Sequence, residues 1–220
     1  MVDDIVVTAI RRSDGAFWAY PLEQRADFSD SPMLFPAGEG GGGEPSPLIT
    51  APLAVDCDSA AGLARTVADE LRYLGPGGNS LPPVEFGAGI VRQQSGRVSI
   101  YKDNLVSLGD KGKSVLFLPT GAETSNVVGW VHNHPTYGFD PTLDLEGRYP
   151  SVDDWTEAER VVTERGVPAS VSLFIVDSVG AVREFNYADK ASFQSLKAPN
   201  MRRGELLPPQ ITTRNCQPKS

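Results

Sequence analysis

Residues 129–135 read Gly-Trp-Val-His-Asn-His-Pro and contain both histidines of the 220-residue chain. The apolar run from Val127 to Val131 predicts a strand that Pro135 ends, because proline has no backbone N–H to donate to a sheet. Side chains alternate between the two faces of a strand, so His132 and His134 are expected on the same face. Two imidazoles placed in this way can bind one metal ion.

The third ligand of such a site is expected downstream of the histidine pair. Catalytic zinc takes three protein ligands and one water, so two histidines are too few. The segment Ser151-Val152-Asp153-Asp154 offers carboxylates, and Asp154 is the predicted ligand. A histidine on a strand is more often an ordinary surface or core residue, and Asp154 could instead be a favourable charge at a helix N-terminus. The gathering of both histidines into one triplet favours the metal site.

Periodicity along the chain predicts helices and strands in mixed order. A first helix is expected to begin at Asp58 or Ser59 and to run to Leu74, because apolar residues recur there at helical spacing. A second helix is expected from Asp154 to Arg165, capped by Ser151 or Asp153. The expected strands cover residues 84–91, 98–101, 114–119, 127–131, 170–176 and 181–187. The last two should form a hairpin, and the whole order predicts an α/β or α+β domain with a mixed β-sheet flanked by helices.

Composition divides the chain into three regions. Residues 1–50 form a β-rich extension with a Gly- and Pro-rich linker at 36–47. Two β-rich runs around Ser13-Asp14-Gly15 in this extension predict a hairpin, or a strand pair that orders only against a partner. Residues 51–198 are long enough to bury one core and form the expected domain. Residues 199–220 are polar and contain proline, so we expect a flexible C-terminal tail.

Charge, hydropathy and cysteine usage exclude several classes of protein. The net charge of −8 argues against binding to nucleic acid, which needs clustered Lys and Arg. No apolar run is long enough to span a membrane, so we expect no membrane contact. The acidic start Met1-Val2-Asp3-Asp4 is unlike a Sec signal, which predicts a cytoplasmic protein or an effector delivered by a non-Sec route. The cysteines, Cys57 and Cys216, are far apart in the sequence and are expected to be two unrelated thiols.

Glu85 in Val84-Glu85-Phe86-Gly87, His132-Asn133-His134-Pro135 and Ser151-Val152-Asp153-Asp154 follow one another along the chain. Together they resemble the pattern of the JAB/MPN (JAMM) metallopeptidases, in which an upstream glutamate precedes His-x-His and then Ser-x-x-Asp. The chain is most similar to bacterial JAB-like domains of polymorphic toxin proteins, over roughly residues 55–187. It departs from the family in residues 135–150, which separate His134 from Ser151 by a longer link than the family usually has.

The resemblance implies a curved mixed sheet with Zn²⁺ at one end, bound by His132, His134 and Asp154. It also implies hydrolysis of a peptide or isopeptide bond in a peptide or protein substrate. In that reaction Glu85 would serve as general base and then general acid, and Ser151 would donate a hydrogen bond to the oxyanion. Taken alone, Glu85 would be interpreted as a solvent-facing glutamate and Ser151 as a helix N-cap. For a toxin-associated domain, a partner or immunity protein is a further expectation.

Two other functions are open to the same sequence. A JAB-like module that binds a peptide, or accompanies a toxin, without hydrolysing a bond would share the fold but not the metal-dependent activity. A nuclease, prompted by the letters HNH, is disfavoured because nuclease motifs of that name spread their residues along a ββα unit. The long link holds Tyr137, Phe139 and Tyr149, which either form a flap over an extended peptide or pack onto the domain.

Overall fold

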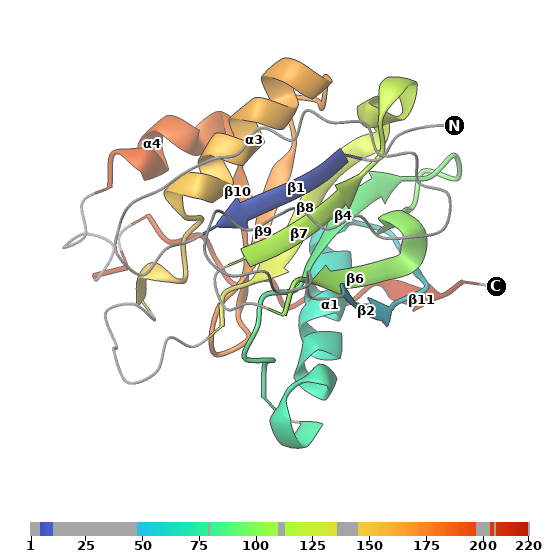
Figure 1. The fold of residues 1–220 in the computed structure, drawn as a ribbon, viewed down its shortest axis with the longest axis vertical. Coiled ribbons are helices and arrows are strands. Elements are labelled where there is room, and N and C mark those ends of the chain that lie inside the picture. Colours follow the sequence, from blue (N-terminus) through green and yellow to red (C-terminus); the bar gives the residue numbers. More distant parts are fainter. Residues whose placement is uncertain are drawn as a thin grey trace, which may run out of the picture.

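The computed structural model describes residues 5–10, 48–78, 80–109, 113–135, 145–196, 203–204 and 206–219. The strands in this part are β1 (Ile5–Ile10), β2 (Ile49–Pro52), β3 (Val55–Cys57), β4 (Gly87–Arg92), β5 (Val98–Ile100), β6 (Asn104–Ser107), β7 (Lys113–Leu118), β8 (Val127–Asn133), β9 (Ser172–Val176), β10 (Val182–Asn186) and β11 (Cys216–Pro218). The α-helices are α1 (Ala60–Leu74), α3 (Val152–Arg165) and α4 (Lys190–Gln194). These elements form a mixed α+β fold, in which helices flank an open and mostly antiparallel sheet (Figure 1).

Strand β4 occupies the centre of the sheet and pairs antiparallel with β5, β6 and β8. The sheet continues from β6 to β7 and β1 on one side, and from β5 to β3 and β11 on the other. Strand β8 pairs in parallel with β9, and β9 forms the predicted antiparallel hairpin with β10. A Cβ atom at Gly89 would lie 2.5 Å from the carbonyl oxygen of Phe117, so glycine is what lets β7 approach β4.

Helix α1 covers one face of the sheet, and its predicted N-cap is confirmed. The Ser59 hydroxyl accepts a hydrogen bond of 3.1 Å from the Gly62 N–H, which satisfies one of the free donors of the first turn. The apolar stripe of this helix packs on sheet residues in one buried cluster that includes Leu63, Val67, Leu71, Ile90, Val131 and Phe174. Each of these side chains contributes about 1.5–3 kcal/mol when it is fully buried.

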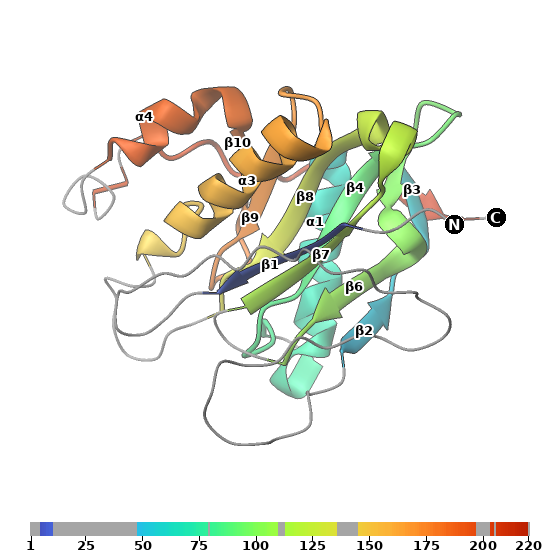
Figure 2. The ribbon, with the colours of Figure 1, turned by 45° about the horizontal axis from the view of Figure 1, so that its top comes forward.

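Helix α3 lies on the opposite face of the sheet (Figures 1 and 2). Its buried cluster includes Trp130, Trp155, Val161, Leu173, Ile175 and Phe185. Along β8, Val131 belongs to the α1 cluster and Trp130 to the α3 cluster, as the alternation of side chains in a strand requires. The same alternation places His132 on the α3 face.

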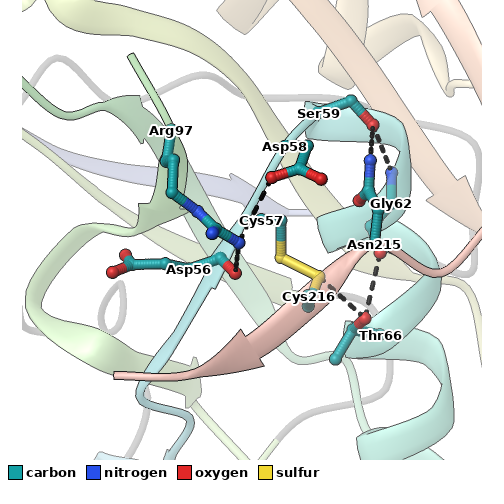
Figure 3. Close-up of a disulfide and its surroundings, with 9 residues drawn as sticks. All are labelled: Asp56, Cys57, Asp58, Ser59, Gly62, Thr66, Arg97, Asn215 and Cys216. Atoms are coloured by element: carbon teal, nitrogen blue, oxygen red, sulfur yellow. Dashed lines mark hydrogen bonds and ion pairs between the residues drawn. A yellow bond between two sulfur atoms is a disulfide. The ribbon is translucent and has the colours of Figure 1, made fainter. Parts of the chain in front are cut away.

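The C-terminal segment corrects two expectations. Instead of forming a free tail, its described part returns to the domain, where the Ile211 N–H donates to the Val182 carbonyl at 2.8 Å and β11 pairs with β3. Cys216 lies directly opposite Cys57 in that pairing, with 4.0 Å between their Cα atoms, and the two form a disulfide (Figure 3). The prediction of two unrelated thiols was therefore wrong, because sequence separation says nothing about which short strands meet at a sheet edge.

Side-chain hydrogen bonds around the disulfide connect the pair of strands β3 and β11 to helix α1. The Asn215 side chain donates to the Ser59 hydroxyl at 3.0 Å, and the Thr66 hydroxyl donates to the Cys216 sulfur at 3.1 Å (Figure 3). On the other side, the Arg97 guanidinium donates to the backbone carbonyl of Asp56 at 2.6 Å. Backbone pairing, side-chain hydrogen bonds and the covalent link thus hold the two short strands β3 and β11 together and against α1.

The N-terminal region contributes a strand to the domain sheet. Strand β1 pairs antiparallel with β7, from Ile5 opposite Leu118 to Ile10 opposite Lys113. The predicted hairpin partner of this strand and the linker at 36–47 lie outside the described residues. Among the helices that the structure describes, none has the length and apolar character needed to cross a membrane.

Candidate metal centre

Strand β8 and the residue that follows it place both histidines on the α3 face. His132 is opposite Gly87 on β4 and level with Ile175 on β9, which leaves its side chain 1% exposed. His134 extends the ladder past the strand end, because its N–H donates to the Val176 carbonyl at 2.8 Å. Both imidazoles are thus held by paired backbone on a rigid sheet.

The first turn of α3 supplies the carboxylate. The Asp154 N–H donates to the Ser151 hydroxyl at 3.1 Å, and the Ser151 N–H donates to Oδ2 of Asp154 at 2.6 Å. This reciprocal arrangement is a capping box, with aspartate in the place of the usual glutamate. Ser151, one of the two predicted caps, is therefore the N-cap, and the helix begins at Val152, two residues before the predicted start. The capping box also orients the carboxylate of Asp154.

The three side chains meet at one point, as the sequence predicted. Nε2 of His132 lies 3.0 Å from Nε2 of His134, and Asp154 lies 3.2 Å from the first of these nitrogens and 3.5 Å from the second. Ligand atoms at zinc-like bond lengths around one tetrahedral ion are separated by about 3.3 Å. The donor atoms of this buried group therefore have the spacing of ligands to a single ion, and the group can hold a metal.

The protonation of His134 supports the same conclusion. Its Nδ1 lies 2.7 Å from the carbonyl oxygen of Gly147, which can only accept, so Nδ1 carries the proton and a neutral ring keeps a lone pair on Nε2. Metal-binding histidines typically donate their second N–H to a carbonyl or carboxylate in this way. A proton on Nε2 of His132 can be donated either to Nε2 of His134 or to the Asp154 carboxylate, but not to both. A metal ion can bind both of these acceptors at once.

The carboxyl group of Asp154 is ionised at neutral pH. Burial by itself raises its pKa, but the imidazole of His132 and then that of His134 outweigh the burial and hold the pKa well below its usual value. An anion therefore faces the two rings. The same two contacts are ion pairs when a ring is protonated.

Glu85 lies two residues before the start of β4, whose first residue, Gly87, pairs with His132. The Asn133 N–H donates to the Phe86 carbonyl at 3.2 Å, and the Asn133 side chain accepts from the Phe86 N–H at 2.8 Å. The Asn133 side chain also donates to the Val84 carbonyl at 3.1 Å, so the backbone on both sides of Glu85 is held against the end of the strand that carries the histidines. Glu85 is only 6% exposed, so the interpretation of a solvent-facing glutamate was wrong.

The long link is described from residue 145 onward. Tyr149 is buried against Phe185 and Phe193, with ring centroids 6.1 and 6.4 Å apart, so it belongs to the core and not to a flap. Tyr137 and Phe139 lie outside the described residues. Sequence reasoning missed the contribution of Gly147 to the site, because a backbone carbonyl has no signature in the sequence.

In comparisons with known proteins, no family model, no curated protein and no solved structure matches this chain. The geometry of the site is therefore the basis for the function proposed below.

Replacement of Ser151 by alanine is expected to lower the free energy of unfolding by about 1 kcal/mol, because the N-cap of α3 is lost. Metal binding should persist, since the Ser151 backbone N–H that holds Asp154 remains. Denaturant unfolding and metal titration measure the two effects. Ser59→Ala is the matched control, because it removes the N-cap of α1, on the other face of the sheet. Loss of metal from Ser151→Ala alone would contradict the structural role assigned to this hydroxyl.

Proposed function

We propose that this protein is a zinc-dependent hydrolase that cleaves a peptide or isopeptide bond. The observation that carries the proposal is the buried group of His132, His134 and Asp154, whose donor atoms all lie within 4.8 Å of one another. Two imidazoles and one carboxylate, with one coordination position left for water or substrate, are a donor set typical of catalytic zinc. A closed structural site would need a fourth protein ligand.

Zinc bound by these residues would polarise a substrate carbonyl and make a water molecule acidic at neutral pH. Glu85 is suited to accept the proton of that water, because it is buried and because the residues on either side of it are hydrogen-bonded to Asn133, which stands between the two histidines. It would then deliver this proton to the departing amine, so that one carboxylate serves as base and acid.

Ser151 is suited to stabilise the negative charge that develops on the substrate carbonyl oxygen. Its oxygen accepts from the Asp154 N–H, which leaves the hydroxyl hydrogen free to be donated. The hydroxyl is fixed at the start of α3, next to the metal ligand. A preorganised donor of this kind is worth about 10²–10³ in rate.

Replacement of Glu85 by glutamine tests the proposal. We expect zinc to stay bound while the turnover of a peptide or isopeptide substrate falls by about 10²–10⁴, because the amide cannot carry the proton. Zinc content and hydrolysis of a peptide library are the measurements, with and without a chelator. Glu123→Gln, at an exposed position of the 3-10 helix Gly121–Asn126, is the control.

The outcomes separate the hydrolase from its main alternative. Chelator-sensitive hydrolysis that the glutamine variant loses supports the enzyme. Bound zinc without hydrolysis of any peptide or isopeptide bond, or a chain that binds no metal, would favour a peptide-binding or toxin-associated module on the same scaffold. Unchanged turnover in Glu85→Gln would remove Glu85 from the mechanism.

A further inference from the structure

We propose that Asp177 is a positioning residue, which fixes His134 in the orientation that metal binding requires. The proposal rests on the metal site described above and concerns a group outside its ligands. Asp177 follows the last residue of β9 and is 1% exposed. A buried carboxylate is costly unless it is paired, so its surroundings show what it holds together.

The carboxylate of Asp177 is fixed from several directions. Oδ1 accepts from the N–H groups of Ala181 at 2.9 Å and Val179 at 3.2 Å, which closes the turn between β9 and β10. Oδ2 accepts from Nη1 of Arg183 at 2.8 Å, an ion pair buried on both sides. Asp177 thereby locks the end of β9 to β10.

One anchor of His134 depends directly on the end of β9. The His134 N–H donates to the carbonyl of Val176, the residue before Asp177. In the parallel register Asn133 is level with Val176, and His134 and Asp177 are the residues that directly follow these two. A shift of Asp177 would therefore move the backbone that positions His134.

The second anchor of His134 is linked to the same carboxylate. The ring donates from Nδ1 to the carbonyl of Gly147, and the next residue, Arg148, brings its Nε to 3.9 Å from Oδ2 of Asp177. The Arg148 side chain is 35% exposed and the Asp177 side chain only 2%, so the arginine is held at the surface by a buried partner. Asp177 thus restrains both the strand that holds the His134 backbone and the segment that holds its ring.

The test is zinc affinity of the full chain, measured by competition with a chromophoric chelator. Asp177→Asn keeps the shape of the side chain and loses its charge, and we expect it to bind zinc about 10–100-fold more weakly, as changes behind a ligating histidine do. The visible spectrum of the cobalt-substituted variant should also differ from that of wild type, because the geometry of the His134 ligand changes.

Asp69→Asn is the matched control. Asp69 is likewise a carboxylate between two arginines, Arg65 and Arg214, but it lies on α1 across the sheet from the metal site. Its variant should lose less stability, because Asp69 and Arg214 are partly exposed, and it should keep the zinc affinity and cobalt spectrum of wild type. A loss of affinity shared by both variants would show a general effect of destabilisation and overturn the role of Asp177.

The remaining outcomes distinguish a failure of the role of Asp177 from a failure of the metal site. Equal zinc affinity in folded Asp177→Asn and in wild type overturns the role of Asp177 and leaves the metal site standing. If Asp177→Asn does not fold, Arg148→Met takes its place; weaker zinc binding in that variant supports the proposal, and unchanged binding overturns it. Wild-type protein that binds neither zinc nor cobalt overturns the metal site and this inference together.

Discussion

Replacing either His132 or His134 by alanine is expected to abolish stoichiometric zinc binding. Each variant keeps two of the three protein ligands, which is too few to hold zinc against water and buffer. The loss should exceed the roughly 10–100-fold weakening that follows from changes behind a ligand. Metal analysis after dialysis, combined with zinc titration of the apoprotein, measures it. Both positions are buried, so thermal unfolding has to show that each variant is folded.

Asp154→Asn extends this test to the third ligand. The amide keeps an oxygen that can accept the Ser151 N–H, so the helix cap can persist while the negative charge is lost. Glu159→Gln, an exposed position on the same helix, is its control. Stoichiometric zinc retained by His132→Ala, His134→Ala or Asp154→Asn would mean that the altered residue is not a ligand.

The second large effect concerns the disulfide. The double variant Cys57→Ala/Cys216→Ala is expected to lose about 2–5 kcal/mol of unfolding free energy, because the link closes a loop spanning 159 residues and restricts the unfolded chain. Denaturant unfolding with and without reductant measures the loss, and reductant should destabilise the wild type but not the double variant. Cys57 belongs to the α1 cluster, across the sheet from the histidines, so zinc affinity should be unchanged.

Two results would contradict this expectation. Alkylation of both thiols in native protein purified without reductant would show that the link does not form. Equal stability of wild type and double variant under oxidising conditions would show that the link contributes nothing beyond the strand pairing around it.

The parts of the fold that the sequence predicts are those that local chemistry determines. Helix α1 follows from Ser59 and an apolar stripe, α3 from the cap at Ser151, and the β9–β10 hairpin from two apolar runs around a glycine turn. The strands β2, β3, β6 and β11 were not predicted, because three or four residues carry no usable period; β5 is equally short and was predicted only from the glycine turn that precedes it. Such strands are defined by the partner beside them, and for β3 and β11 that partner is more than 150 residues away.

The candidate site likewise contains residues that the sequence predicts and residues that it does not. The spacing of His132 and His134 and the choice of Asp154 came from period-two geometry and ligand number, and the structure brings these residues together. Gly147 and Asp177 could not be predicted, since one acts through a backbone carbonyl and the other through a turn that forms only when β9 and β10 pair. Tyr149 was assigned to a flap as one alternative because aromatic residues look alike in a core and in a loop.

The order in which the chain is synthesised affects how the disulfide forms. At about 5–20 residues per second, Cys216 is synthesised roughly 10–30 s after Cys57. Throughout that interval Cys57, which is fully buried in the finished fold, is a lone thiol on β3, whose partner strand β11 has not yet emerged. With two cysteines in these 220 residues there is no wrong partner within the chain. The error open to a nascent molecule is therefore a bond to a second copy, so covalent dimers are the misfolded product to look for during expression.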